Sequence, residues 1–170
     1  MTFPPITLDT VTRIESIATA GWPFISAIAW SRDGVLLCAA GAHGIALWRD
    51  GFGPEPDAQF AADVPLKDAA FSPDGRQLAT AGAYAFIDLW DTASGVRSGG
   101  IQPSVSAQAA YDAVAWSPDG ATLAFGGVDR VLYVWDVHAN QLRHRLEGHG
   151  DEITSAAFSA DSSLLISGSW

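Results

Sequence analysis

Apolar and polar positions repeat along this chain at a nearly constant interval. Each repeat opens with a short apolar run that starts with a large side chain and ends with Ala followed by an aromatic residue. The large side chains are Ile25, Leu66, Tyr111 and Ile153, and the aromatic residues are Trp30, Phe71, Trp116 and Phe158. Apolar runs of this length predict inner β-strands that are buried on both faces.

A tight turn follows each run. Its copies are Ser31-Arg32-Asp33-Gly34, Ser72-Pro73-Asp74-Gly75, Ser117-Pro118-Asp119-Gly120 and the altered form Ser159-Ala160-Asp161-Ser162. The steps from one turn Asp to the next are 41, 45 and 42 residues. Pro presets φ, Asp bonds to the local backbone and Gly accepts a positive φ, so these segments reverse the chain into a hairpin. We interpret the recurring aspartates as turn formers rather than as paired catalytic carboxylates.

Three further strands complete each of the first three repeats, and the fourth repeat has one further strand. The predicted return strands are 35–40, 77–81, 122–126 and 163–168. In three repeats a second turn leads to a strand that ends at Trp48, Trp90 or Trp135, and a shorter, more polar strand such as 141–146 follows. A period of about 40–45 residues is typical of four-stranded propeller blades. We therefore expect an all-β fold.

The Trp-Asp pairs at Trp90-Asp91 and Trp135-Asp136, together with Gly148-His149, make the chain resemble the WD40-repeat β-propeller family over about residues 10–170. Trp48-Arg49 departs from that pattern. The resemblance implies one domain, 1–170, that forms a partial WD40-type propeller. Its expected parts are a lone outer strand at 10–19, three complete four-stranded blades at 24–60, 64–101 and 111–147, and an incomplete two-stranded blade at 151–170.

The resemblance also implies a buried structural tetrad of His, Ser or Thr, Asp and Trp. The matching positions are Thr80, Trp90, Asp129, Trp135, His149 and Ser167. No repeat has all four members, because Tyr84 stands at the Asp position of the second repeat and Phe125 at the hydroxyl position of the third. The missing members are expected to affect rigidity rather than activity.

By the same resemblance the chain is a non-catalytic scaffold that binds a protein or peptide on the face formed by the loops entering the inner strands. Aromatic and arginine side chains commonly anchor such interfaces. The candidate anchors are Trp22, Tyr84, Tyr111 and Arg130, each with ordinary packing or a solvated surface as the alternative. A second hypothesis is that the chain is the propeller segment of a larger enzyme or signalling protein, because one fold hosts many functions.

The composition argues against two classes of binding partner. The net charge is −10 and Lys67 is the single lysine, so neither nucleic acid nor an anionic membrane surface is expected to bind. The single cysteine, Cys38, lies in a predicted strand and is interpreted as a small buried hydrophobe. The first residues have neither the basic start nor the apolar core of a signal peptide, so a cytoplasmic location is expected.

Motifs for catalysis, cofactors or metals were not found. The histidines at 138, 144 and 149 lack the tight paired spacing of zinc ligands, and the chain has neither a Gly-x-Ser-x-Gly elbow nor a phosphate-binding glycine loop. The strand count suggests the N-terminal part of a longer propeller, with an assembly of half-rings as the alternative. Association through the open propeller edges, one of them at 163–168, is expected.

Overall fold

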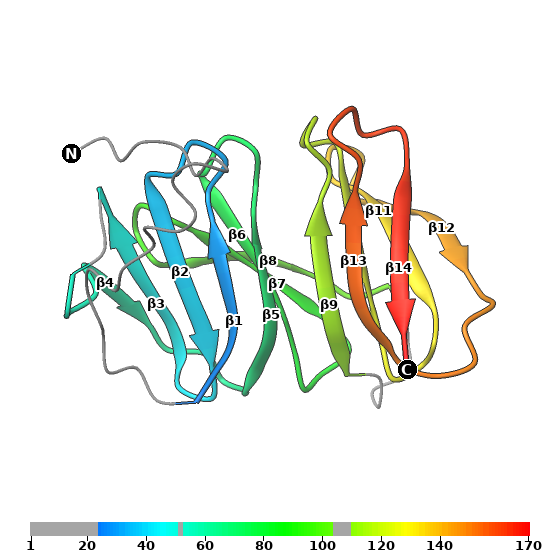
Figure 1. The fold of residues 1–170 in the computed structure, drawn as a ribbon, viewed down its shortest axis with the longest axis horizontal. Helices are drawn as coiled ribbons and strands as arrows, with labels where there is room; N and C mark the ends of the chain where they lie inside the picture. The colour runs from blue at the N-terminus through cyan, green and yellow to red at the C-terminus, as the bar shows by residue number, and fades with distance from the viewer. Residues whose placement is uncertain (1–23, 51–52, 104–109) are drawn as a thin grey trace, which may run out of the picture.

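The computed structural model describes residues 24–50, 53–103 and 110–170. All regular structure in these residues is β-strand, arranged as three four-stranded antiparallel sheets and one two-stranded sheet (Figure 1). This confirms the predicted fold class, although the described residues form no closed propeller ring. The expected strand at 10–19 lies outside the described residues.

Strands follow one another in chain order within each sheet. The first sheet contains β1 (Ile25–Trp30), β2 (Leu36–Gly41), β3 (Gly44–Arg49) and β4 (Ala58–Phe60). The second contains β5 (Leu66–Phe71), β6 (Gln77–Gly82), β7 (Ile87–Asp91) and β8 (Arg97–Ile101). The third contains β9 (Tyr111–Trp116), β10 (Thr122–Gly127), β11 (Leu132–Asp136) and β12 (Gln141–Leu146), and the last β13 (Ile153–Phe158) and β14 (Leu165–Ser169).

The first strands of the sheets are neighbours in the order β1, β5, β9 and β13. Figure 1 shows β1, β9 and β13 pointing the same way, so equivalent loops gather at the same end of the molecule. We call the end with the four Ser-x-Asp turns the turn end. The opposite end, where the chain enters β1, β5, β9 and β13, is the entry end.

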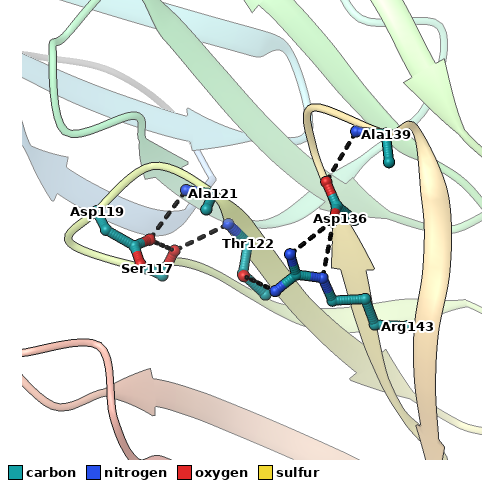
Figure 2. A network of polar contacts seen from close by, with 7 residues as sticks. All are labelled: Ser117, Asp119, Ala121, Thr122, Asp136, Ala139 and Arg143. Atoms are coloured by element: carbon teal, nitrogen blue, oxygen red, sulfur yellow. Dashed lines mark hydrogen bonds and ion pairs between the residues drawn. The ribbon is translucent and has the colours of Figure 1, made fainter.

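Hydrogen bonds within each Ser-x-Asp turn fix the register of the hairpin that follows. In the third sheet the Ser117 hydroxyl donates to Asp119 Oδ1 at 2.5 Å and accepts from the Thr122 amide at 2.9 Å, while Asp119 also accepts from the Ala121 amide (Figure 2). The same three bonds recur in the other turns. Gly120 has a φ of +74° in its turn, whereas Ser162 adopts +63° without being glycine. The recurring aspartates therefore do form turns.

The aspartate of each Trp-Asp pair organises a second turn after the third strand. Asp136 accepts from the Ala139 amide and forms an ion pair with Arg143 (Figure 2). Asp91 accepts from the Ser94 amide in the equivalent turn. Arg49 occupies this position in the first sheet and donates to the Thr92 carbonyl of the second sheet at 2.6 Å. A bond within one repeat is thus replaced by one between repeats.

The core lies between successive sheets. Cys38, Ile45 and Leu47 of the first sheet pack against Leu78 and Trp90 of the second. Burial raises the pKa of the Cys38 thiol to about 12, so this cysteine is protonated and behaves as a hydrophobe. A second layer joins side chains of the second sheet, such as Ala79 and Ile87, to an aromatic group in the third.

A partly buried carboxylate links the second and third sheets. The Asp68 carboxylate on β5 accepts from the Val114 amide on β9 at 2.9 Å and from its neighbouring Ala69 amide at 2.8 Å. Burial raises the pKa of Asp68, and these two hydrogen bonds partly oppose that rise. Asp68 therefore gives a polar connection between two inner strands.

The expectation that all inner strands are buried on both faces is wrong for β1 and β13. Ile28 on β1 is 66% exposed, and Thr154 and Ser155 on β13 are also exposed. The reason is that, within the described residues, a neighbouring sheet covers only one face of each of these strands. Ile166 on β14 is likewise exposed. Association of copies through this edge stays a prediction.

We predict that the turn hydroxyls contribute according to their burial. Ser117→Ala removes two hydrogen bonds from a side chain that is almost fully buried, and should lower the free energy of unfolding by about 1–3 kcal/mol. Ser159→Ala is the matched control in a more exposed turn, where water replaces the lost partner, and should cost less. Denaturant unfolding measures both values. Equal costs would contradict this account of the turns.

The Asp161 turn makes a prediction about acid. Hydrogen bonds from the Ser159 hydroxyl and then from Ser163 lower the pKa of Asp161 from 3.8 to about 2. Because the folded pKa lies below the unfolded one, the stabilisation is fully present above about pH 4 and is lost as the pH falls through about 2. Carboxyl NMR titration should show this low pKa, and Ser159→Ala should raise it. An ordinary pKa for Asp161 would show that the turn does not hold its carboxylate.

Candidate functional site

Two residues at the expected tetrad positions meet in the second sheet. Trp90 Nε1 on β7 donates to Thr80 Oγ1 on β6 at 2.9 Å, and both side chains are buried. The Trp90 ring also stacks on Phe60 of the first sheet, with 6.4 Å between ring centroids. This pair therefore joins the strands within one sheet and packs that sheet against its neighbour.

The equivalent position in the third sheet is built from aromatic rings. Asp129 and Trp135 do not meet, since Asp129 accepts from the Tyr133 hydroxyl at 2.7 Å. Trp135 Nε1 is buried and has no hydrogen-bond acceptor in the described part of the chain. Phe125 stands at the position of Thr80 and stacks on Tyr133, with 5.6 Å between centroids. Replacement of a hydroxyl by Phe125 thus leaves the Trp135 indole without its acceptor.

The other repeats satisfy their polar groups in different ways. His149 Nε2 lies 2.8 Å from Ser167 Oγ, which ties the loop before β13 to β14. In the first sheet Ala39 holds the hydroxyl position, and Trp48 Nε1 donates instead to the Gly53 carbonyl at 3.0 Å. The positions are therefore equivalent in the fold but not in their hydrogen bonds.

Two of the candidate anchors lie exposed at the entry end. Tyr84, in the β6–β7 turn, is 53% exposed and stacks on Phe86 with 6.1 Å between centroids. The Arg97 guanidinium lies 5.3 Å from the centre of the Phe86 ring and pairs with Asp88. Burial raises the pKa of Asp88, while Arg97 opposes the rise. Tyr84 is thus the outer member of an organised stack.

Arg130 and Tyr111 differ in what they can contact. Arg130 is exposed in the β10–β11 turn, with a φ of +65° and its amide bonded to the Gly127 carbonyl. Tyr111 is 0% exposed, and its ring meets Phe125 and Tyr133 edge-on. Burial raises the pKa of its phenol. The interpretation of Tyr111 as a surface anchor is wrong, because the residue starts β9 and faces the neighbouring sheet. Trp22 lies outside the described residues.

Phe24 lies at the same end, in the loop 21–24 that was expected to belong to the binding face, but it was not among the candidate anchors. This residue is 76% exposed, has a φ of +55° and lies 6.0 Å from His43, measured between ring centroids. Phe24, Tyr84 and Arg130 are the exposed aromatic and arginine side chains that we group as the entry surface.

A hollow of about 300 Å³ at the turn end was also missed. Its walls include Trp30, Phe71 and Trp116, and its rim includes Arg32, Pro73 and Pro118. These aromatic residues end β1, β5 and β9, and the recurring pattern made them look like ordinary core residues. Because the three strands are neighbours, their equivalent ends converge on one space, which a single repeat cannot reveal.

In the described residues, no three His, Cys, Asp or Glu side chains gather as they would around a metal ion. Among the same residues, no helix has the length and apolar character needed to cross a bilayer.

Comparison with known families agrees with this architecture. The model for the WD40 family, described as WD domain, G-beta repeat, matches residues 108–136 and 140–170. The first two sheets repeat the strand order and turn geometry of the third. Residues 108–170 therefore consist of WD40 repeats, and the first two sheets are consistent with WD40 blades. No curated protein matches it.

The two buried tryptophans give a matched test of the hydrogen bond to Thr80. Trp90→Phe removes an indole that is bonded, whereas Trp135→Phe removes one that has no acceptor among the described residues. Both lose ring area, but we expect Trp90→Phe to lower the free energy of unfolding by about 1 kcal/mol more. Denaturant unfolding of the two variants provides the comparison. A larger loss for Trp135→Phe would mean that its N–H is satisfied in solution.

Proposed function

We propose that this WD40 domain is a non-catalytic scaffold that binds a protein or peptide at the entry surface formed by Phe24, Tyr84 and Arg130. Its four sheets serve as successive blades of one domain, 24–60, 64–101, 111–147 and 151–170. The observation that carries the proposal is the exposed Tyr84 ring, held by its stack on Phe86 in a turn between two core strands.

Aromatic and arginine side chains on firm supports suit this role. Tyr84 offers a large contact area and a hydroxyl, and its stacked position lowers the entropy lost when a partner orders it. Phe24 adds an exposed apolar ring, and Arg130 adds guanidinium donors on a neighbouring sheet. WD40 domains generally mediate protein binding, which makes a protein or peptide the favoured ligand class.

The compartment is part of the same proposal. Cys38 is a free, buried thiol, and the chain has no second cysteine for an internal disulfide. Such cysteine usage is compatible with a reducing compartment. We therefore place the scaffold in the cytoplasm.

Selection from a random peptide library tests the entry surface. Peptides that bind the 170-residue chain are titrated against wild type, Tyr84→Ala and Arg130→Asn, since Asn tolerates the positive φ of Arg130. We expect each variant to weaken binding about tenfold or more, as for an interface anchor. Leu142→Ala on the outer strand β12 is the control and should bind like wild type.

Two outcomes would contradict this assignment. The first is a set of selected peptides that bind all four proteins equally. The second is binding that depends on Leu142 but not on Tyr84 or Arg130. Either result would place recognition outside the entry surface, and circular dichroism of each variant separates lost binding from lost folding.

A further inference from the structure

The hollow at the turn end is a second candidate site, on the face opposite to the entry surface. Trp30 is 56% exposed, although it ends an inner strand, and it faces the same space as Phe71 and Trp116. Three aromatic side chains therefore surround a volume of about 300 Å³, which is at the small end of ligand pockets. Space of this size suits one long side chain better than a folded element.

Each of the four turns that border the hollow carries an aspartate next to a residue that lines it. Arg32, Pro73, Pro118 and Ala160 line it, and each is the second residue of a Ser-x-Asp turn. The next residue in every turn is an aspartate, at 33, 74, 119 and 161. Hydrogen bonds from the turn serines lower the pKa of all four carboxyls, so each is ionised at neutral pH. Four negative charges therefore lie in the turns that border the hollow.

Nearby cations only partly balance these carboxylates. Arg76 lies close enough to Asp74 to lower its pKa, and Arg143 acts weakly on Asp119 while it is paired with Asp136. Arg32 is the remaining cation of the rim within the described residues. With four carboxylates against these three arginines, one of them engaged elsewhere, the rim favours a positively charged occupant.

The contact made by Arg32 indicates that a guanidinium group fits this rim. The equivalent residues of the next two turns are Pro73 and Pro118, so the arginine departs from the pattern. Its Nη1 donates to the Pro118 carbonyl at 3.2 Å and so connects the first turn to the third. The Pro118 carbonyl is thus an acceptor at the hollow that already takes a guanidinium donor.

We propose that this hollow binds an arginine side chain of a partner protein, which replaces Arg32 at the Pro118 carbonyl and lies against the rings of Trp30 and Trp116. A guanidinium stacks on aromatic faces and donates hydrogen bonds in its plane, which matches aromatic walls combined with a carbonyl on the rim. The acidic turns draw a basic segment to this end. A proline-rich or purely apolar segment would use the rings but not the charges.

The test uses the 170-residue chain and the blocked peptide acetyl-Ala-Arg-Ala-amide. Its matched control contains citrulline, which has almost the same shape as arginine and no charge. We expect the arginine peptide to shift the indole NMR signals of Trp30 and Trp116 saturably at millimolar concentration, as befits one side chain. The citrulline peptide should bind about tenfold more weakly, and added salt should weaken the arginine peptide only.

Variants separate this site from the entry surface. Trp30→Ala should weaken binding of the arginine peptide about fivefold or more. Arg32→Pro, which introduces the residue of the next two turns, should strengthen binding severalfold because the resident cation is gone. Tyr84→Ala should leave its affinity unchanged. The proposal for the entry surface and the proposal for the hollow can therefore be contradicted independently of each other.

Three results would overturn the proposal. One is equal binding of the arginine and citrulline peptides. Another is tighter binding of a triproline peptide than of the arginine peptide, which would indicate recognition by apolar contact alone. The third is a lack of indole shifts with Arg32→Pro at millimolar peptide, since that variant presents the hollow without its own guanidinium.

Discussion

The hydrogen bond between the serine and the aspartate of each turn is the interaction on which the repeats depend. One hydroxyl donates to the carboxylate and accepts the amide that starts the next strand, so the turn and the strand register are set together. A register shift by one residue would move every side chain to the opposite face. The packing of side chains between the sheets therefore depends on the four small polar turns at the turn end.

One buried position of the repeat carries chemically different side chains in different sheets. Thr80 supplies an acceptor to Trp90, whereas Phe125 gives Trp135 none and packs with Tyr111 and Tyr133 instead. A buried, unpaired N–H costs about 1–3 kcal/mol, and the added aromatic contact area offsets a cost of that size. The repeats thus keep their geometry while the chemistry of one position changes from polar to aromatic.

The strands were predictable because their signals are local. Turn residues and strand-ending tryptophans lie within one repeat. β12 has the predicted bounds, and β7 and β11 end one residue after the tryptophan at which the sequence predicted their ends. Features that depend on neighbouring repeats were not predictable in this way. Tyr111 was a candidate anchor but is covered by the adjacent sheet, and the hollow at Trp30 exists only because several strand ends converge.

The polar contacts between sheets also affect how the domain unfolds. Arg49 bonds to Thr92 between the first and second sheets, Asp68 to Val114 between the second and third, and Asp119 to Ser162 between the third and fourth. Each boundary therefore has a bond that a single repeat cannot form alone. In a linear array such nearest-neighbour coupling spreads opening from one unit to the next. The Val114 amide should then exchange its hydrogen only when the second and third sheets separate, which makes it a natural reporter of cooperativity across the array.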